Sequence, residues 1–414
     1  GRDPFNYNIP KMPTGFPELT AVGLMTKESP LAVKKGSRQL LVGLPKETSS
    51  NEKRIVLSPE SVGLLSNNGI QVVMESGAGL YAKFNDQDYS DAGAKISYSR
   101  KEVFQADVVL KIDPPSLEEI KEMTQGACLI SALQLENQSA EFIQGLNEKK
   151  ITAVAFEYLE DKVGGMPVVR AMSEIAGSTV MLIAAEYLSS VNEGKGLILG
   201  GVTGVPPTQV VIIGAGTVAE YAARTALGLG ANIKVFDNHI YKLRRIKHLI
   251  GQQIYTSTLD NHGLSQALAE ADVVIGALRA EKGKNKIVVT EEMVANMMHG
   301  SIIIDVAIDQ GGCFETSKMT SHDEPVYKVH DIIHYCVPNI ASRVARTASY
   351  SLSNIFTPIL LQMIDLGGAE EMIFNYRWFL RGVYTYRGSL TNALMARKFG
   401  LNHKELQLLL AARY

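Results

Sequence analysis

Short apolar runs alternate with helical patterns along the first part of the chain. Four runs bounded by turn residues predict buried strands, at residues 39–45, 70–74, 108–112 and 128–133. A helix is predicted from Ser58 to about Asn67, because a serine cap precedes a proline at the first helical position. Strands that alternate with helices favour a parallel sheet covered on both faces.

The pattern resumes in the second half of the chain. A long apolar helix is predicted over residues 172–188, and a glycine-rich loop follows at 195–207. Beyond about Arg346 the pattern is mainly helical, with helices predicted over 349–365 and 389–398. Between the loop and this tail, four more buried strands are predicted, at residues 210–213, 233–236, 273–277 and 302–306.

The first of these later strands runs directly into a glycine turn, Gly214-Ala215-Gly216-Thr217-Val218-Ala219. Gly214 permits the tight turn, and Gly216 lets a pyrophosphate approach bare backbone at the start of a helix. Ala219 is small enough for that helix to pack on the strand. The turn therefore predicts a dinucleotide site, against the simpler interpretation that it only joins a strand to a helix.

An acid follows at the end of the next strand. Asp237 lies at about the 20-residue spacing expected for a carboxylate that accepts hydrogen bonds from the adenosine ribose. The same charge repels a 2′-phosphate, so the motif favours NAD over NADP. Lys242 is a second candidate for the adenosine end, although an ordinary helix lysine fits its position equally well.

These patterns predict an α/β protein with two Rossmann-like domains and parallel sheets, the first domain discontinuous and completed by the C-terminal helices. A length of 414 residues suits two or three cores. We expect the ligands to bind between the two domains. The predicted boundaries are residues 1–37 for an N-terminal extension, 38–170 plus 347–414 for a substrate (catalytic) domain, and 171–346 for an NAD-binding Rossmann domain.

Composition narrows the classes of partner. A net charge of −2 without a basic cluster gives no sign of a nucleic-acid partner. The cysteines, Cys128, Cys313 and Cys336, form no CxxC pair and no metal-ligand pattern, which favours a cytoplasmic protein with reduced thiols and no metal. No apolar run approaches the roughly 20 residues that span a bilayer, so no membrane partner is expected. Residues 17–25 form an amphipathic patch that we interpret as a docked helix or tail rather than a targeting peptide.

Several motifs together resemble the alanine dehydrogenase family, which includes the NAD-binding subunit of proton-translocating transhydrogenase. The resemblance covers roughly residues 41–401. The segments that carry it are residues 43–47 (Gly-Leu-Pro-Lys-Glu) with 51–54 (Asn-Glu-Lys-Arg), 171–177, 200–202, 305–315 and 335–339. The last two segments are more similar to the dehydrogenases than to the transhydrogenases.

Membership of this family implies oxidative deamination of an L-amino acid to a 2-oxo acid and ammonia, with NAD accepting the hydride. The resemblance assigns Arg54, in a Glu-x-Arg motif, to the substrate carboxylate, which a planar guanidinium can bind by both oxygens. It places Asp309 beside the nicotinamide; from spacing alone Asp309 and Asp305 are turn or capping residues about as often as ligands. Family relatives form hexamers or dimers, so a homo-oligomer is expected.

The resemblance also outlines the cofactor site. It places Met172 and Ser173 beside the nicotinamide and its amide. Glu157 matches a family acid near the active site, although an ordinary acid at a strand end is as plausible. The remaining positions expected to line the NAD site are Thr217, Val218, Leu278, Arg279, Val306, Ala307, Ile308, Lys318, Val337, Pro338, Asn339 and Ile340.

Two positions depart from the family pattern. Alanine dehydrogenases carry Lys-x-Lys-x-Pro where this chain has Lys111-Ile112-Asp113-Pro114-Pro115, so an anion replaces the second lysine. The family's catalytic histidine lies in a Leu-His-Leu context, and Gln134 occupies that position here. Glutamine does not titrate near neutral pH and cannot act as a general acid or base.

Three interpretations stay open. In the first, the chain is an amino-acid dehydrogenase whose proton transfer uses Asp113, Asp309 or water, with Lys111 or Arg170 supplying the missing cation. In the second, the substrate is a different amino or imino acid that brings its own cationic group to Asp113. In the third, the chain binds NAD as a regulatory or transhydrogenase-like module without dehydrogenase activity.

Overall fold

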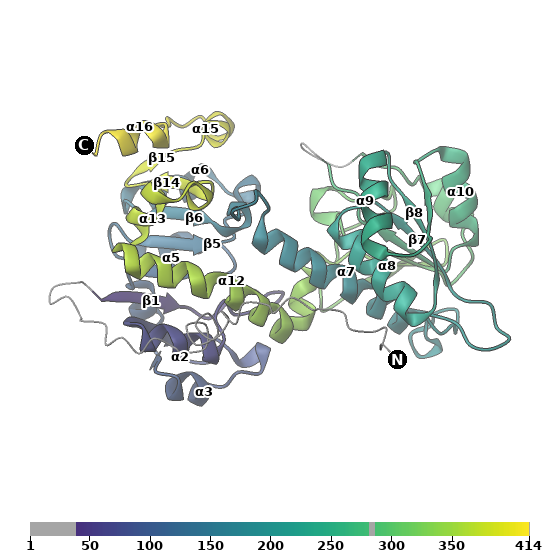
Figure 1. Cartoon of the computed structure of the whole chain (residues 1–414), viewed down its shortest axis with the longest axis horizontal. Helices are drawn as coiled ribbons and strands as arrows, with labels where there is room; N and C mark the ends of the chain where they lie inside the picture. The colour runs from purple at the N-terminus through teal and green to yellow at the C-terminus, as the bar shows by residue number, and fades with distance from the viewer. Residues whose placement is uncertain (1–38, 281–285, 414) are drawn as a thin grey trace, which may run out of the picture. The chain divides into compact units, whose positions relative to one another are not determined.

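The computed structural model describes residues 39–280 and 286–413 (Figure 1). The predicted N-terminal extension, residues 1–37, and its amphipathic patch lie outside the described residues.

The first sheet has eight strands in the order β15-β14-β6-β5-β4-β1-β2-β3. Strands β1 to β6 are parallel, and β14 and β15 add an antiparallel hairpin at one edge. Most side chains of the central strands are buried, as expected for a parallel sheet covered on both faces. The strands are β1 (Leu40–Leu44), β2 (Ile70–Glu75), β3 (Lys95–Ser97), β4 (Val108–Leu110), β5 (Cys128–Ser131), β6 (Thr152–Ala155), β14 (Val383–Tyr386) and β15 (Ser389–Leu390).

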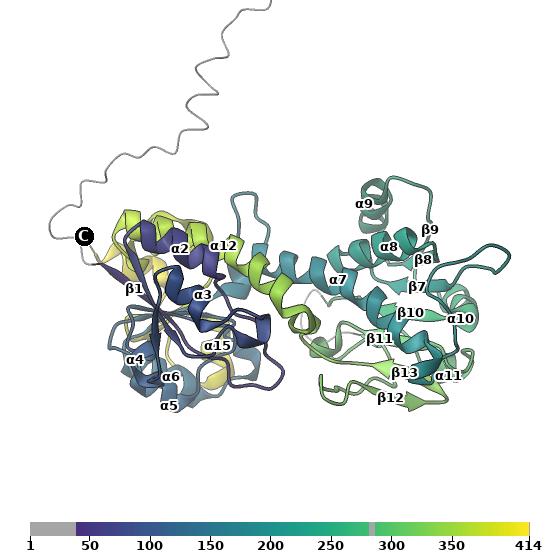
Figure 2. The same ribbon diagram turned by 90° about the horizontal axis from the view of Figure 1, so that it is seen from below.

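Helices cover both faces of this sheet. Figure 2 shows α2 (Pro59–Asn67) and α12 (Ala345–Leu366) on one face, and α4 (Arg100–Phe104), α5 (Leu117–Glu122) and α6 (Ala140–Glu148) on the other. The apolar face of α12 packs into the same core as β1 and α2, so the end of the chain returns to the first sheet. The remaining helices of this part are α3 (Asp86–Asp91), α13 (Ala369–Asn375), α14 (Arg377–Leu380), α15 (Ala393–Phe399) and α16 (Leu406–Ala411).

The second sheet has seven strands in the order β12-β13-β11-β10-β7-β8-β9, and all but β12 run parallel. The strand order reverses direction on either side of β7, and in open α/β sheets ligands bind at such a point. The strands are β7 (Gln209–Ile213), β8 (Asn232–Phe236), β9 (Tyr255–Ser257), β10 (Val273–Gly276), β11 (Ile302–Asp305), β12 (Val326–Val329) and β13 (Ile332–Tyr335).

Helices α7 and α8 pack on one face of the second sheet and share one core with it. Gly177 lies where the two helices meet, and a Cβ atom there would lie 2.5 Å from the carbonyl oxygen of Val218. Close approach of α7 to α8 therefore requires glycine at this position. The helices of this part are α7 (Pro167–Leu188), α8 (Thr217–Leu229), α9 (Ile240–Ile250), α10 (Asn261–Glu270) and α11 (Glu291–Ala295).

Helix α7 corrects the expectation that no apolar segment approaches membrane-spanning length. With 22 residues and a mean hydropathy of 1.4 over its most apolar window, it is long and apolar enough to cross a bilayer. The same composition suits a core helix, and α7 packs against α8 and α12. Among the described residues, no other helix passes this test of length and composition.

The structure confirms the predicted α/β class with two mainly parallel sheets, and corrects the expected C-terminal part. Residues 389–390 belong to a strand, β15, and not to a helix; the helix begins at Ala393 after the Asn392 cap. The first sheet is therefore completed by a β-hairpin as well as by helices. The sequence does not predict this hairpin, because its strands, of four and two residues, are too short for a regular alternation of hydrophobic and polar residues to be recognised. The domain boundaries proposed from the sequence stay a prediction.

Two helical glycines offer a matched test of the α7–α8 contact. Gly177→Ala should lower the free energy of unfolding by roughly 1–3 kcal/mol or more, because its methyl group overlaps α8. Gly228→Ala, in α8 with no atom within 4 Å of the place its methyl group would take, should raise it by about 0.5–1 kcal/mol. Urea unfolding monitored by circular dichroism measures both changes, and equal effects of the two variants would contradict close packing at Gly177.

Candidate functional site

The carboxyl ends of four neighbouring parallel strands of the first sheet bring the predicted substrate residues to one edge. Strands β6, β5, β4 and β1 are adjacent in that order. Glu157 follows β6, Gln134 follows β5, Lys111 and Asp113 follow β4, and the segment with Arg54 follows β1. Because parallel strands end at the same edge, residues far apart in the sequence are brought together there.

A bidentate ion pair holds the side chain of Arg54. Its Nε donates to Oε1 of Glu52 and its Nη2 to Oε2, each at 2.8 Å. Nη1 lies 3.3 Å from the sulfur of Met172, a weak acceptor. The pair leaves the edge between Nη1 and Nη2 without a carboxylate, and a guanidinium can bind one carboxylate on each edge.

Glu52 also connects Arg54 to the segment that follows β13. Its Oε2 accepts a hydrogen bond from Nδ2 of Asn339 at 2.9 Å. Next to it, the amide of Lys53 donates to Oγ of Ser342 at 2.8 Å. Glu52 is 1% exposed, and although burial raises its pKa, the charge and hydrogen bonds of Arg54 lower the pKa further, so that the net shift is downward.

Lys111 is buried and paired with a carboxylate that also caps backbone amides. Its Nζ lies 3.2 Å from Oε2 of Glu47 and donates to the carbonyl oxygen of Asp113. Glu47 accepts hydrogen bonds from the amides of Ile112 and Asp113. Burial raises the pKa of Glu47 to about 7, although Lys111 and the amide of Ile112 lower it. Lys111 is therefore already paired within the protein and is not a free cation.

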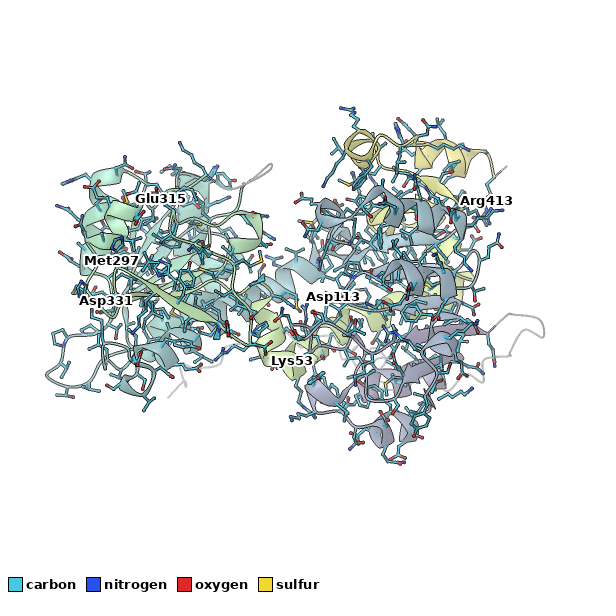
Figure 3. All side chains as sticks on the ribbon, turned by 180° about the vertical axis from the view of Figure 1, so that it is seen from behind. Lys53, Asp113, Met297, Glu315, Asp331 and Arg413 are labelled. Carbon is cyan, nitrogen blue, oxygen red and sulfur yellow. The ribbon has the colours of Figure 1, made fainter. Side chains whose placement is uncertain are left out.

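Asp113 is half-buried, and its carboxylate has no hydrogen-bond or salt-bridge partner among the described residues. Burial and the charge of Glu52 raise its pKa, while Lys111 and Arg54 lower it. Figure 3 labels Asp113 together with Lys53, the neighbour of Arg54. An anion thus stands unpaired in the same charge cluster as Arg54.

The turn after β5 presents Gln134 in a strained backbone conformation. Gln134 is exposed and has φ 47° and ψ 49°, in the left-handed region that side chains rarely adopt. The carboxyl group of Glu157 supports this turn, since its Oε1 accepts the amide hydrogen of Leu133 at 3.2 Å. Burial raises the pKa of Glu157 to about 7, against the lowering effect of these backbone amides. In this chain the group with a pKa of about 7 is therefore Glu157, which supports the turn, and not the residue at position 134.

The glycine turn of the second sheet combines a tight turn with bare backbone at the start of α8. Gly214 has φ 115°, and a Cβ atom there would lie 2.6 Å from the carbonyl oxygen of Ala277. At Gly216 a Cβ atom would meet no other atom within 4 Å, so the backbone faces open space. No side chain caps the start of α8, and its first amides remain available to an anion.

Asp237 lies at the end of β8, as predicted, and is 1% exposed. Its Oδ1 accepts the amide hydrogen of His239 at 2.7 Å and lies 3.0 Å from Nδ1 of the same residue. This contact fixes the carboxylate at the sheet edge through Oδ1. Lys242 is half-buried on the first turn of α9.

The structure separates the roles of the two acids after β11. Asp305 is 0% exposed, and accepts hydrogen bonds from the amides of Ala307 and Cys313 and from the hydroxyl of Ser317. It is the turn-capping residue. Asp309 is exposed within η5 (Ile308–Gln310); surrounding protein raises its pKa, and the nearby charge of Arg279 lowers it.

The other expected cofactor residues gather on α7 and at the ends of three adjacent strands. Met172 and Ser173 are half-buried on α7. Strands β10, β11 and β13 are neighbours and end at one edge. The segments that follow them carry Leu278 and Arg279, then Val306, Ala307 and Ile308, then Val337, Asn339 and Ile340.

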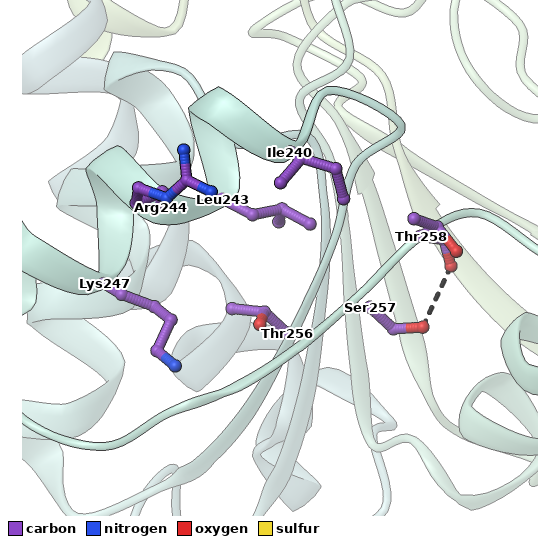
Figure 4. A pocket seen from close by; sticks show the side chains of 7 residues that line it. All are labelled: Ile240, Leu243, Arg244, Lys247, Thr256, Ser257 and Thr258. Carbon is purple, nitrogen blue, oxygen red and sulfur yellow. Dashed lines mark hydrogen bonds between the residues drawn. The ribbon is translucent and has the colours of Figure 1, made fainter.

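A separate pocket of about 360 Å³ lies between α9 and the end of β9 (Figure 4). Its lining is mixed: Ile240 and Leu243 are apolar, whereas Arg244, Lys247 and the hydroxyl-bearing residues 256–258 are polar. It borders the Asp237 strand, because the amide of Asp237 donates to the carbonyl oxygen of Ser257. None of the predicted NAD residues lines it, and within the described ranges no group of three metal-ligating side chains was found.

Sequence reasoning missed two acids that shape this region. Glu52 stood in the Glu-x-Arg motif, yet nothing local showed that it also binds Asn339, 287 residues away. Glu47 was part of a family motif without an assigned role. Glu47 closely follows a predicted strand, and this position could have identified it as a site residue. No sequence pattern indicates that Glu52 also binds Asn339.

Comparison with known proteins places most of the described chain in one family. The N-terminal domain model of "Alanine dehydrogenase/PNT" matches residues 43–176, and the C-terminal domain model matches residues 180–393. The alanine dehydrogenase of Staphylococcus haemolyticus (strain JCSC1435) is 37% identical over 367 residues, covering 88% of this chain and 98% of that protein.

Solved structures agree with the sequence matches. An L-alanine dehydrogenase superposes with a TM-score of 0.82 at 34% identity, covering 87% of this chain and 99% of that one. A transhydrogenase from Sinorhizobium meliloti superposes with a TM-score of 0.74 at 26% identity, covering 86% and 99%. Both the two-sheet architecture and the sequence motifs are therefore those of one family.

The raised pKa of Glu157 makes stability depend on pH. A carboxyl that titrates near 7 when folded and near 4.5 when unfolded stabilises the fold below pH 4.5, and this contribution is lost as pH rises through 7. Glu157→Gln should therefore gain melting temperature relative to wild type between pH 5 and pH 8, as measured by differential scanning calorimetry. Glu136→Gln, which removes an exposed carboxyl on the same turn, is the control. If the melting temperatures of all three proteins change in parallel with pH, the raised pKa of Glu157 is contradicted.

Proposed function

The chain belongs to the alanine dehydrogenase/PNT family, and from this premise we propose that it is an NAD-dependent oxidoreductase that deaminates an L-amino acid to a 2-oxo acid and ammonia. The observation that carries the proposal is the arrangement of Arg54. Its guanidinium is fixed by Glu52 on one edge and open on the other, which suits a substrate carboxylate.

The glycine turn supports NAD as the cofactor. Gly214, Gly216 and the free amides at the start of α8, including Thr217 and Val218, would hold the pyrophosphate. Asp237 would bind the adenosine ribose with its second carboxylate oxygen. When bound, NAD accepts a hydride from the substrate carbon. The chain's own residues would orient the two reactants and move protons.

The remaining family positions bear on which amino acid is used. Lys111 is already paired with Glu47, and Asp113 and Gln134 differ from the lysine and histidine expected from the family resemblance. The unpaired carboxylate of Asp113 favours, as a second candidate, an amino or imino acid that carries an additional cationic group. Asp309, exposed in η5 beyond the end of β11, would lie beside the nicotinamide and orient the attacking water.

We place the enzyme in the cytoplasm as a homo-oligomer, hexamer or dimer, with small-molecule partners and no nucleic-acid or membrane partner. Its net charge of −2 supports the absence of a polyanion partner. All three cysteines are free and buried, which fits a reducing compartment.

Cofactor choice provides one test. Wild-type protein should bind NADH more tightly than NADPH, because the carboxylate of Asp237 repels a 2′-phosphate. Asp237→Asn should reduce the ratio of the Kd for NADPH to the Kd for NADH by about tenfold or more. The substitution removes one charge repulsion, while the hydrogen bond to His239 can persist. Fluorescence titration with both nucleotides measures it, with the exposed Glu270→Gln as control. Tighter binding of NADPH by wild type would show that Asp237 was misinterpreted.

Substitution of Arg54 tests the substrate site. Arg54→Lys keeps the positive charge that buried Glu52 needs but cannot bind one carboxylate on each of two edges. It should raise the KM for the amino acid about 10- to 100-fold and leave the Kd for NADH nearly unchanged.

Steady-state kinetics and NADH fluorescence give the two constants, and unfolding curves check that the variant is folded. Equal weakening of amino-acid and NADH binding would count against a substrate role for Arg54. NADH binding without turnover of any amino or 2-oxo acid would identify a binding module and overturn the proposed activity.

A further inference from the structure

The charged residues at the ends of β1 and β4 do not balance. The cluster holds three carboxylates, Glu47, Glu52 and Asp113, and two cations, Arg54 and Lys111. Each cation is already engaged: Lys111 with Glu47 at 3.2 Å, and Arg54 with Glu52 at 2.8 Å. Above pH 7, where Glu47 is ionised, one negative charge is left over, and it resides on the carboxylate without a partner.

That carboxylate belongs to Asp113. Within the described residues no donor contacts its side-chain oxygens, although its own backbone amide and carbonyl are bound by Glu47 and Lys111. The charges that act on it are Glu52 and Glu47, which repel it, and Lys111 and Arg54, which attract it from within their own ion pairs. A half-buried carboxylate in this state gains most from a cation that arrives from outside.

We propose that Asp113 binds an ammonium group of the amino-acid substrate while the open edge of Arg54 binds the substrate carboxylate. This inference rests on the proposed amino-acid dehydrogenase activity and names the group that selects its substrate. A zwitterion carries both charged groups on one carbon atom. Its ammonium group pairs with Asp113 and its carboxylate with Arg54, so binding adds no net charge to the cluster. A 2-oxo acid offers Asp113 no cation, so the site favours the amino acid.

The same contact accounts for proton transfer without a titrating residue at position 134. The substrate amine must be neutral before the hydride leaves its carbon. Asp113 accepts that proton: an N–H bond breaks and an O–H bond forms on the carboxylate. Bound NAD would accept the hydride with its electron pair, which leaves the substrate as an iminium ion. Water adds to this ion, 2-oxo acid and ammonium leave, and Asp113 returns its proton to solvent.

The test compares Asp113→Asn with Asp113→Lys in the full chain. Asp113→Asn should raise the KM for the amino acid about 10- to 100-fold, leave the KM for the 2-oxo acid unchanged or lower, and leave NADH binding intact. It should also remove the loss of kcat/KM at low pH that protonation of Asp113 causes in wild type. Asp113→Lys should lower the KM for the 2-oxo acid, because a cation now faces its carbonyl.

Asp365→Asn, an exposed carboxyl on α12, is the matched control and should change neither constant. A substrate panel separates the two possible sources of the ammonium group. If affinity for L-alanine and other neutral amino acids falls in Asp113→Asn, the α-ammonium is bound. If only L-ornithine and L-lysine are affected, the side-chain cation is bound, and proton transfer from the α-amine to Asp113 is contradicted. An equal change for amino acid and 2-oxo acid, or no change at all, would overturn the proposal.

Calorimetric titration of amino acids into the NADH complex keeps this test separate from the proposed activity. If wild type turns over nothing, the activity fails, but ammonium recognition still predicts amino-acid binding that Asp113→Asn loses. Identical binding to wild type and Asp113→Asn, or no binding of any amino acid, would contradict recognition by Asp113.

Discussion

The buried ion pair between Glu52 and Arg54 fixes the substrate side of the proposed site. Removing two charges from water is costly, and the cost is offset only when geometry and further hydrogen bonds are good. Here two parallel contacts of 2.8 Å meet that condition, and Asn339 donates to the same carboxylate. Because one edge of the guanidinium is held, the other keeps a defined direction toward an incoming carboxylate.

The cofactor side depends on the absence of side chains rather than on charge pairs. At Gly214 a neighbouring carbonyl group leaves no room for a Cβ atom, while at Gly216 the space beside the backbone stays open. The proposed substrate and cofactor residues are connected through residues 51–54. Glu52 accepts a hydrogen bond from Asn339, and the amide of Lys53 donates to Ser342, both after β13. The proposed substrate and cofactor residues therefore share one set of contacts, although they follow strands of different sheets.

Much of the fold could be predicted from the sequence. Buried parallel strands are short apolar runs, and the Ser58 cap with Pro59 marks the start of α2 correctly. Predictions failed where strands were too short for a period, as in β14 and β15, and where a core helix had the composition of a membrane span, as in α7. In both cases tertiary contacts, and not local patterns, decided the outcome.

The sequence by itself determined the features that are encoded within a few residues: the glycine turn, the helix that follows it, and Asp237 at the end of the next strand. Backbone conformation and strand spacing are local, so neighbouring residues suffice to specify them. Only the tertiary structure decided which charges are paired. Lys111 is bound by Glu47, Glu52 is shared with a residue 287 positions away, and Asp113 is left without a partner among the described residues. A charge's chemistry depends on its neighbours in space, and those neighbours come from strand ends that lie far apart along the chain.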